Sequence, residues 1–209
     1  DVLAKLTAVK DTETVEIRVD FIGNGVYLWH RAMLVSVADT NGVVKKIVGK
    51  LYSIHEEKLQ SQELILRAER DSLTGVYNHS TFVSKVSRFL AEFDETLCAL
   101  YMIDLDDFKL VNDALGHYAG DDLLCDTAVV LESVVNTYGG FSGRLGGDEF
   151  SMFIPDVVDE DTAYMVAKTL NKGIRAIKCK AEHSASIGIA VDTISKSLKF
   201  DSLYYKADQ

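Results

Sequence analysis

The chain has 209 residues, of which 47% are hydrophobic and 26% are charged, and this composition excludes a disordered, collagen-like or disulfide-rich chain. The formal net charge is -10. Residues 1–70 carry ten acidic and ten basic side chains, so the whole excess falls in residues 71–209. A general nucleic-acid-binding protein has the opposite sign. The second part of the chain is therefore either only solubilised by its carboxylates or uses some of them to hold cations.

No apolar run approaches the ~20 residues that a membrane helix needs, and the N-terminus lacks the basic and then apolar pattern of a signal peptide. The three cysteines, Cys98, Cys125 and Cys179, are odd in number and not clustered, which favours reduced thiols over disulfides or metal ligands. We therefore expect a soluble, cytoplasmic protein, with no membrane segment in this chain and no nucleic-acid partner.

The N-terminal part of the chain has the pattern of antiparallel strands. Apolar and polar residues alternate with period two over residues 14–21. Turn-forming residues at 23–25 and 41–42 separate this segment from residues 26–38 and 43–54. We expect a three-stranded meander, whose apolar face needs a covering layer that the sequence does not visibly supply.

Residues 55–70 are strong helix formers. Leu59, Leu66 and Leu73 repeat at intervals of seven residues, but the intervening core positions are polar. The segment therefore predicts a connecting helix and leaves dimerisation through a coiled coil open.

After Asp71 the pattern changes to alternating helices and strands. Segments with a helical apolar stripe or a short apolar run follow in this order: helix 82–93, strand 97–103, helix 123–135, a strand ending near residue 145, strand 150–154, helix 160–177 and strand 184–191. A helix followed by the order βαββαβ is typical of the ferredoxin-like split βαβ fold. We therefore expect an α+β domain whose four-stranded antiparallel sheet carries its helices on one face.

Two acidic clusters are expected at one end of this sheet, because the first and third strands of the βαββαβ order are antiparallel neighbours. The first strand runs into Asp104, Asp106 and Asp107, and the third follows a turn that contains Asp148. Carboxylates held together repel one another unless they are protonated or share a cation, and oxygen ligands suit Mg²⁺. The alternative is that Asp106 and Asp107 cap the following helix and that Asp148 lies in an ordinary hairpin turn.

The residues at this end of the sheet resemble those of a known family. Gly146-Gly147-Asp148-Glu149-Phe150 is the signature of the GGDEF family, the diguanylate cyclases. Residues 71–78, 104–121 and 186–190 are similar to other motifs of that family, and the resemblance covers residues 71–209. It implies a palm-type GGDEF domain of the ferredoxin-like class.

The resemblance implies a reaction and the residues that carry it. Two GTP molecules, one in each subunit of a homodimer, condense to cyclic di-GMP and release two pyrophosphates, as each 3'-hydroxyl attacks the α-phosphorus of the other nucleotide. Two Mg²⁺ or Mn²⁺ ions per site are expected to neutralise the triphosphate, held by Asp104, the carbonyl of Leu105, Asp148 and Glu149. The expected catalytic residues are Asp148 as a candidate base, Glu149, and Lys109 against phosphate charge.

The resemblance also implies the contacts to GTP. Gly146 and Gly147 are expected to let the backbone approach the phosphates without a Cβ in the way. Asn112 and Asp121 are expected to read the guanine edge, because an acceptor carboxylate matches the guanine donors and not adenine. The remaining expected substrate contacts are Phe108 and His117.

Several of these residues have a structural alternative. Phe108 and the side chain of Leu105 also fit a hydrophobic core. His117 lies between two glycines and also fits a residue that fixes a loop by hydrogen bonding. Asp71 and Thr74 also fit a cap on the first helix of the domain, without a contact to substrate.

The chain departs from the family pattern at three places. Thr137-Tyr138-Gly139-Gly140 stands where the family carries its product-inhibition motif Arg-x-x-Asp, so no inhibitory product site is expected. His79-Ser80 follows Asn78, where the family usually has arginine. The chain stops at Ala207-Asp208-Gln209, before the family's basic C-terminal helix, so we expect a domain truncated at its C-terminus with an incomplete phosphate clamp.

Residues 1–56 resemble the C-terminal half of a PAS sensor domain. Gly25-Val26-Tyr27-Leu28-Trp29 is similar to the Gly-x-Tyr-x-Trp strand of that family. The resemblance implies an unidentified small-molecule ligand, and it accounts for the missing covering layer. Residues 57–70 then connect the sensor to residues 71–209.

The leading hypothesis is a PAS-regulated diguanylate cyclase that is active as a dimer. One alternative is a catalytically degenerate module that binds GTP and signals through a partner. Another is a nucleotide cyclase with a mixed product, against which Asp121 argues because its carboxylate favours guanine.

Overall fold

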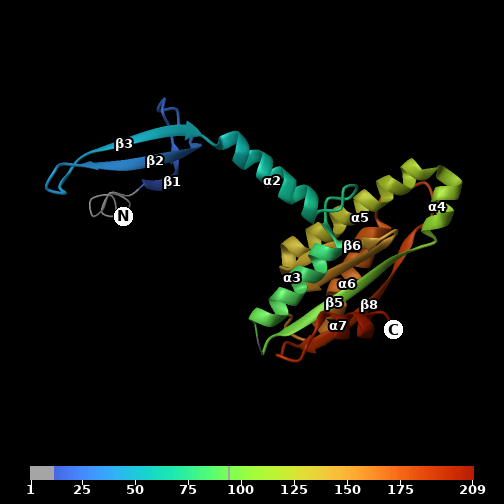
Figure 1. The fold of residues 1–209 in the computed structure, drawn as a ribbon. Helices are drawn as coiled ribbons and strands as arrows, with labels where there is room; N and C mark the ends of the chain where they lie inside the picture. Colours follow the sequence, from blue (N-terminus) through green and yellow to red (C-terminus); the bar gives the residue numbers. More distant parts are fainter. Residues whose placement is uncertain (1–11, 94) are drawn as a thin grey trace. The chain divides into compact units, whose positions relative to one another are not determined.

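The computed structural model describes residues 12–93 and 95–209. The chain divides into two compact units, Asp1–Leu66 and Arg67–Gln209, whose elements are labelled in Figure 1. Each unit has a sheet of its own. Among the described residues, no helix is both long and apolar enough to cross a membrane.

The first unit contains the predicted antiparallel meander. β1 (Thr12–Val19), β2 (Leu28–Ala38) and β3 (Val44–Ser53) lie in the order β1-β2-β3. In the first turn, the Asp20 carboxylate accepts hydrogen bonds from four backbone amides, among them those of Gly23 at 2.8 Å and Gly25 at 2.7 Å. The alternation of the sequence and its turn residues were therefore sufficient to predict these strands.

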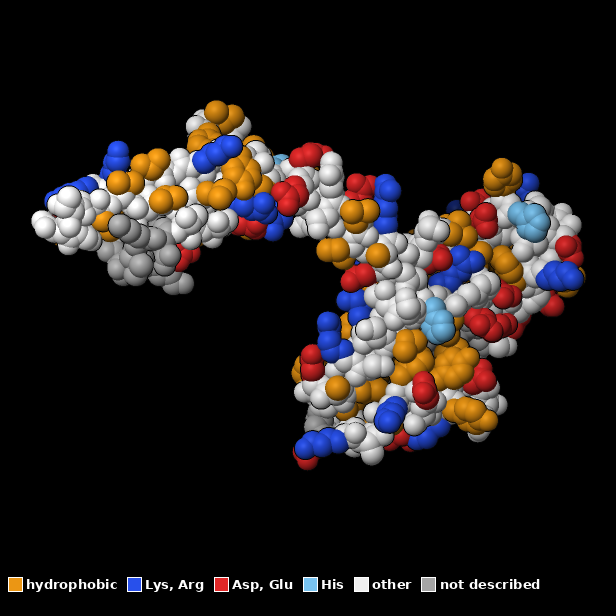
Figure 2. Space-filling model, viewed as in Figure 1, with side chains coloured by type: hydrophobic (Ala, Val, Ile, Leu, Met, Phe, Trp, Pro, Cys, Tyr) orange, Lys and Arg blue, Asp and Glu red, His pale blue; other side chains and the backbone are white. Residues whose placement is uncertain are grey.

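Most apolar side chains of the meander are open to solvent. Val48 is 51% exposed and Leu51 is 43% exposed, and Figure 2 shows apolar side chains in orange over these strands. Among residues 12–66, the buried side chains are those of His30, Ala32, Ser36 and Ile54. The described residues of this unit therefore supply no layer over the sheet, and its assignment to a PAS domain stays a prediction.

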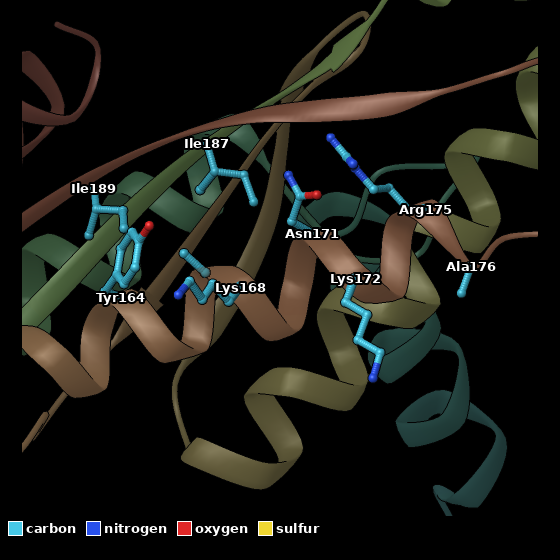
Figure 3. A pocket seen from close by; sticks show the side chains of 9 residues that line it. Tyr164, Lys168, Asn171, Lys172, Arg175, Ala176, Ile187 and Ile189 are labelled. Atoms are coloured by element: carbon cyan, nitrogen blue, oxygen red, sulfur yellow. The ribbon is translucent and has the colours of Figure 1, made fainter.

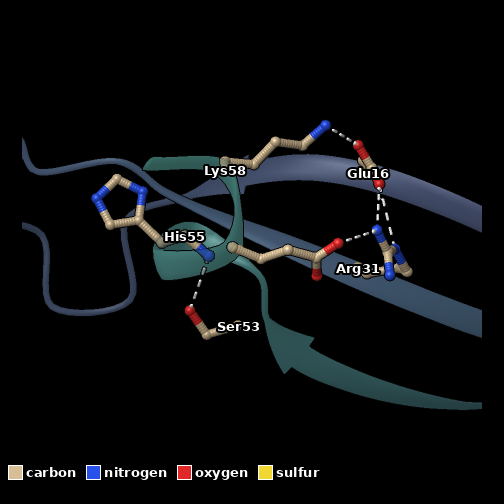
Figure 4. A network of polar contacts seen from close by, with 6 residues as sticks. Glu16, Arg31, Ser53, His55 and Lys58 are labelled. Carbon is tan, nitrogen blue, oxygen red and sulfur yellow. Dashed lines mark hydrogen bonds and ion pairs between the residues drawn. The ribbon is translucent and has the colours of Figure 1, made fainter. Parts of the chain in front are cut away.

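A polar network joins the start of α2 (His55–Glu69) to the meander (Figure 4). Lys58 forms an ion pair with Glu16 of β1 at 2.7 Å, and Glu16 also pairs with Arg31 of β2 at 2.8 Å. The Lys58 ammonium and then the Arg31 guanidinium lower the pKa of the Glu16 carboxyl. The Ser53 hydroxyl accepts a hydrogen bond from the His55 amide at 3.4 Å. The first turn of the helix is thus held by ion pairs to β1 and β2.

The second unit is an α+β domain built on a five-stranded sheet. Its strands are β4 (Tyr77–Asn78), β5 (Leu97–Asp106), β6 (Phe141–Gly146), β7 (Glu149–Ile154) and β8 (Ser184–Thr193), in the order β4-β6-β7-β5-β8. The four longer strands are antiparallel and follow the predicted ferredoxin-like order, with β5 beside β7. The short β4 pairs in parallel with β6, and the sequence did not predict it.

Helices cover both faces of this sheet (Figure 1), so the prediction of helices on one face is wrong. One face carries α3 (His79–Glu92) and α7 (Phe200–Ala207), and the other carries α4 (Phe108–Leu115), α5 (His117–Tyr138) and α6 (Glu160–Arg175). The physical reason lies in β5, which buries Leu100 toward the first face and Tyr101 toward the second. A strand that is apolar on both sides needs two covering layers.

The three cysteines are free thiols, as the sequence predicts. Cys98 lies in β5 and is fully buried, and this burial raises the pKa of its thiol to about 12. The thiol is therefore protonated at neutral pH and a poor nucleophile or metal ligand.

Candidate active site

The two acidic clusters meet where β5 and β7 lie side by side. Asp104 of β5 is directly opposite Glu149, the first residue of β7. Asp148 precedes Glu149 in the turn, and its carbonyl oxygen accepts a hydrogen bond from the Leu105 amide at 3.4 Å. The sheet topology thus brings together three of the residues that the sequence assigns to metal binding.

The carboxylates at this edge repel one another. Partial burial, followed by the negative charges of Asp148 and Asp106, raises the pKa of the Asp104 carboxyl. A carboxylate in this position is destabilised in its charged form, and a bound cation relieves that cost. The electrostatics of the site therefore favour a metal ion or another positive charge beside Asp104.

Asp106 has a different role from its neighbour Asp104. Its carboxylate accepts hydrogen bonds from the hydroxyls of Ser184 and Ser186 on β8, the latter at 2.6 Å, and these bonds lower the pKa of Asp106. Asp107 occupies the N-cap position of α4 at φ 55°, without a capping bond from its side chain. The alternative in which Asp106 and Asp107 cap the helix through their side chains is therefore wrong.

Arg144 forms hydrogen bonds to the glycine turn, and the sequence did not predict this role. The guanidinium of Arg144 donates from Nε and Nη2 to the Gly147 carbonyl at 2.9 and 2.6 Å, and from Nη1 to Asp71 at 3.1 Å. Gly147 has φ 53°, and a Cβ built there would meet no atom within 4 Å. The turn thus presents open backbone to solvent, and the position of Arg144 two residues before Gly146 was the only sequence signal for its role.

Asp71 does not cap the first helix of the domain. Burial acts to raise its pKa, but bonds from the Thr74 hydroxyl and amide and the Arg144 guanidinium outweigh burial, and the pKa of Asp71 is lowered. The N-cap of α3 is Asn78, whose side chain accepts from the Thr81 amide at 3.0 Å. Asp71 instead links the first residues of the second unit to the glycine turn, because Arg144 bonds to both Asp71 and Gly147.

The expected guanine-reading residues lie on α4 and at the start of α5. Asn112 is on α4 and Asp121 is in the second turn of α5. A Cβ built on Gly120 would lie 2.0 Å from the Asn112 Oδ1 and 3.2 Å from the Phe108 Cζ. The missing side chain of Gly120 therefore lets Asn112 lie against α5, at the residue before Asp121.

The other expected substrate contacts are placed as follows. Lys109 is exposed on α4, and Phe108 packs against the core as the structural alternative has it. His117 is the exposed first residue of α5, and its interpretation as a residue that fixes a loop stays a prediction. The side chain of Leu105 is 1% exposed and belongs to the core, as the structural alternative has it, while its backbone carbonyl stays the candidate metal ligand.

A cavity of about 370 Å³ lies beside the carboxylates. It is lined by Asp104, Glu149, Ser186, Gly188 and the last residues of α7 and after it. Gly188 is needed there, because a Cβ would come 1.8 Å from the Ala207 carbonyl oxygen. Asn112 and Asp121 do not line this cavity, so the structure does not bring all of the expected GTP contacts into one pocket.

The donor set suits Mg²⁺ with help from a ligand. Within residues 12–93 and 95–209, no cluster of three or more His, Cys, Asp or Glu side chains is arranged to hold a metal ion by itself. Asp104 and Asp148 supply two interacting carboxylates, and Mg²⁺ in proteins commonly takes one or two carboxylates together with phosphates of the substrate. The residues therefore fit a metal ion that binds together with a phosphorylated ligand.

A ferredoxin-like sheet with an intact Gly-Gly-Asp-Glu-Phe turn opposite Asp104 defines the class of domain. The family model described as "Diguanylate cyclase, GGDEF domain" matches residues 68–209. The chain belongs to the GGDEF family.

Relatives of known name are found on both sides of cyclic di-GMP metabolism. The chain is 32% identical over 159 residues to the cyclic di-GMP phosphodiesterase PdeB of Shewanella oneidensis. The aligned segment covers 75% of this chain and 18% of that protein. It is 30% identical over 165 residues to the diguanylate cyclase DgcM of Escherichia coli. That alignment covers 76% of this chain and 38% of DgcM. The chain thus spans less than half the length of either relative.

Solved structures are similar over the same part of the chain. The coiled coil and GGDEF domain of DgcB from Caulobacter crescentus, in complex with c-di-GMP, matches with a TM-score of 0.63 and 27% identity. The match covers 74% of this chain and 84% of that chain. The α+β fold of the second unit is therefore that of GGDEF domains.

Proposed function

We propose that this protein is a diguanylate cyclase, which condenses two GTP molecules into cyclic di-GMP and two pyrophosphates. The observation that carries the proposal is the meeting of Asp104 with Asp148 and Glu149 beside an intact glycine turn. The mutual repulsion of these carboxylates supports a bound cation at this edge of the sheet, which the proposed reaction needs.

In the proposed reaction, the chain supplies charge, position and a proton acceptor. Asp104, Asp148, Glu149 and the Leu105 carbonyl would hold two Mg²⁺ or Mn²⁺ ions, and these ions would supply positive charge against the triphosphate and the attacking hydroxyl. The turn at Gly147, fixed by Arg144, lets the backbone approach the phosphates. Asp148 accepts the proton of the 3'-hydroxyl as it attacks the α-phosphorus, and Lys109 stabilises the phosphate charge.

Guanine selection is proposed for Asn112 and Asp121. The Asp121 carboxylate accepts from the N1 and N2 donors of guanine, which adenine does not match. The close packing at Gly120 supports this pairing because it brings Asn112 against the helix that carries Asp121. His117, at the first position of α5, is proposed to contact the nucleotide from the same end of that helix.

Regulation by the first unit is part of the proposal. Each site holds half of the reactants, so a homodimer is needed for turnover. Residues 1–56 are proposed to belong to a PAS domain with an unidentified small-molecule ligand, and residues 57–70 to connect it to residues 71–209. The uncovered apolar face of the meander supports the PAS assignment.

Feedback by the product through the family's usual site is not expected. The Arg-x-x-Asp motif would fall on residues 137–140, and Gly140 has φ 120° with an imaginary Cβ only 2.1 Å from the Phe153 carbonyl oxygen. This position has no room for an aspartate side chain. Cyclic di-GMP is added to the assay at concentrations well below those at which it competes with GTP, and the initial rate is expected to stay unchanged. Strong noncompetitive inhibition would contradict this expectation.

A second candidate is a catalytically degenerate module that binds GTP and acts through a partner. Two observations favour it: His79-Ser80 stands where the family usually has arginine, and one relative carries the name of a phosphodiesterase. Both candidates share GTP binding, so binding alone does not distinguish them.

The test is incubation of the protein with GTP and Mg²⁺, followed by chromatography of the nucleotides. The protein concentration is raised until light scattering shows a dimer. Formation of cyclic di-GMP together with two equivalents of pyrophosphate is expected. GTP binding without product at dimer concentrations favours the degenerate module, and a lack of GTP binding contradicts both candidates.

A further inference from the structure

The Asp106 carboxylate is held by two hydroxyls of the neighbouring strand. Ser184 lies opposite Asp106 in the register of β5 with β8, and its hydroxyl donates to Asp106 Oδ2. Ser186 lies opposite Asp104, yet its hydroxyl donates to Asp106 Oδ1 at 2.6 Å. Each carboxylate oxygen of Asp106 therefore has a hydrogen-bond donor of its own, which fixes the orientation of the group.

The direction of these bonds separates Asp106 from the proposed metal ligands. β5 lies between β7 and β8 in the sheet. Asp104 is opposite Glu149 of β7, whereas the Asp106 carboxylate contacts the serines of β8. Asp106 is thus held on the β8 side of its strand, although it is only two residues from Asp104.

The segment of β8 that carries the serines is anchored to α6. Ala185, between the two serines, is 5% exposed, and its carbonyl accepts a hydrogen bond from Asn171 Nδ2 at 2.8 Å. Figure 3 shows that Asn171 and Arg175 extend from α6 toward β8. The two hydroxyls therefore project from a backbone that is fixed by core packing and by a hydrogen bond.

The surroundings of Asp106 favour its negative charge. An aspartate is already ionised at neutral pH. The hydroxyls of Ser184 and Ser186, and then the positive charge of Arg175, outweigh partial burial and lower the pKa of Asp106 further. Arg175 belongs to a basic segment, residues 168–180, which contains five basic and no acidic side chains. Asp106 is therefore a permanent negative charge at neutral pH.

This charge reaches the proposed metal site. Residues two positions apart on a strand are separated by about 7 Å, which is less than the screening length of about 10 Å at 0.1 M salt. In agreement with this spacing, Asp106 acts together with partial burial and Asp148 to raise the pKa of Asp104. A negative charge that disfavours a neighbouring carboxylate attracts a cation to the same place.

The position of Asp106 also affects the Leu105 carbonyl, the proposed backbone ligand. This carbonyl belongs to the planar peptide group that joins Leu105 to Asp106. The Leu105 side chain is packed in the core, and the Asp106 side chain is held by two hydroxyls. The peptide group between them is therefore restrained from both sides.

We propose that Ser184 and Ser186 hold Asp106 as a fixed negative charge beside the metal site, and that Asp106 raises the affinity of this site for a divalent cation without binding the ion itself. Asp106 is then a positioning residue that acts through Asp104 and the Leu105 carbonyl. The inference rests on the proposed function, because that function assigns the metal site to these two neighbours.

The probe is Mn²⁺ alone, because the electron paramagnetic resonance signal of the free ion decreases when the ion binds to protein. Asp104→Asn lacks a proposed ligand and defines the share of binding that belongs to the site. At about 0.1 M KCl, Asp106→Asn is expected to weaken this binding about threefold to tenfold, the effect of one charge about 7 Å away in a solvated site. Asp161→Asn removes the same charge from the exposed first turn of α6 and is expected to leave the affinity unchanged.

Two further measurements distinguish a fixed charge from a general structural role. The loss in Asp106→Asn is expected to shrink to less than about twofold at 1 M KCl, where the screening length is about 3 Å. Ser186→Ala, which frees one carboxylate oxygen, is expected to weaken Mn²⁺ binding at least about twofold, and Ser186→Thr, which keeps the hydroxyl, is expected to restore it. Circular dichroism verifies folding, and the two Ser186 variants decide the outcome if Asp106→Asn does not fold.

Three results overturn the inference: equal Mn²⁺ affinity of Asp106→Asn and the wild type, a loss in Asp106→Asn that does not shrink at 1 M KCl, or a Ser186→Thr variant that binds as weakly as Ser186→Ala. The absence of Mn²⁺ binding that depends on Asp104 also overturns it. Product formation from GTP tests the proposed function separately. A wild type that forms cyclic di-GMP while Asp106→Asn binds Mn²⁺ normally would contradict this inference alone.

Discussion

Asp104 carries the clearest electrostatic signature in the second unit. Partial burial, Asp148 and Asp106 raise the pKa of its carboxyl above the unfolded value. For a carboxyl with a raised folded pKa, the contribution to stability is fully present below the unfolded pKa and is lost as the pH rises through the folded pKa. At neutral pH the charged Asp104 therefore opposes folding, and binding of a cation is the expected compensation.

The first prediction is that Asp104→Asn stabilises the metal-free protein at pH 7. The effect is expected to be at most about 1 kcal/mol because the side chain remains accessible to solvent, which corresponds to a rise of about 2–4 °C in melting temperature. Thermal unfolding in the presence of a chelator measures it. Asp113→Asn, on the exposed face of α4, is the control and is expected to change little; a lower melting temperature for Asp104→Asn would be evidence against the crowding of carboxylates.

The second prediction concerns metal binding at the same residue. Addition of Mg²⁺ with a non-hydrolysable GTP analogue is expected to raise the melting temperature of the wild type, because ligands that bind only the folded state stabilise it. The rise is expected to be largely lost in Asp104→Asn and kept in Asp113→Asn. Equal rises in all three proteins would remove Asp104 from the metal site.

The third prediction is that Gly120→Ala weakens GTP binding about tenfold, the scale of one lost hydrogen bond. The new Cβ would lie 2.0 Å from the Asn112 Oδ1, so the Asn112 side chain must leave its present position against α5. Titration with a fluorescent GTP analogue measures the affinity.

Gly173→Ala on α6 is the matched control for this change. Its Cβ would meet Val130 Cγ1 at 2.6 Å, so we expect a loss of stability with unchanged GTP affinity. If Gly120→Ala binds GTP as the wild type does, Asn112 does not read the base.

At the scale of elements, the Asp71–Arg144 ion pair joins the entry of the domain to the glycine turn. The fourth prediction is that Asp71→Asn costs about 1–2 kcal/mol at pH 7, because a partly buried charged hydrogen bond is lost. A carboxyl with a lowered folded pKa stabilises the protein above its unfolded pKa, and this contribution is lost as the pH falls through the folded pKa. Urea unfolding of both proteins should therefore give free energies that converge below about pH 4; a difference that is independent of pH would rule out the charge as its cause.

Some elements could be predicted because the spacing of their apolar side chains along the sequence matches that of a strand or a helix. β1 alternates, and β5 and β7 are short apolar runs between turns, so their order and the meeting of Asp104 with Glu149 followed from topology. β4 has only two residues, too few for a period to appear.

Other features depend on contacts that leave no local signal. α4 starts at Phe108 and only Asp107 separates it from the end of β5, so no loop of several polar residues marks the boundary in the sequence. The bond between Arg144 and Asp71 joins residues that are 73 positions apart. The Ser184 and Ser186 hydroxyls that hold Asp106 are even farther along the chain. Such contacts become visible only when the strands are paired.

At the scale of the whole molecule, the charge of the chain has two uses. Most carboxylates lie on the surface, and Figure 2 shows red side chains distributed over the second unit. A few of them, at Asp104 and Asp148, crowd together and create a site for cations. An acidic domain can in this way accept a polyanionic nucleotide, because metal ions reverse the sign of the local charge. The basic segment at residues 168–180 is a second local reversal.

The central claim is that the carboxylates beside the glycine turn carry out the condensation of GTP. The most direct measurement is the rate of cyclic di-GMP formation by wild type, Asp148→Ala and the control Asp126→Ala, an exposed carboxylate of α5. Asp148→Ala is expected to lose more than ~10³-fold in rate, the scale of a main electrostatic stabiliser, with a melting temperature no lower than that of the wild type in the absence of metal. Asp126→Ala is expected to keep the wild-type rate. An Asp148→Ala variant that retains most of its activity would contradict the account.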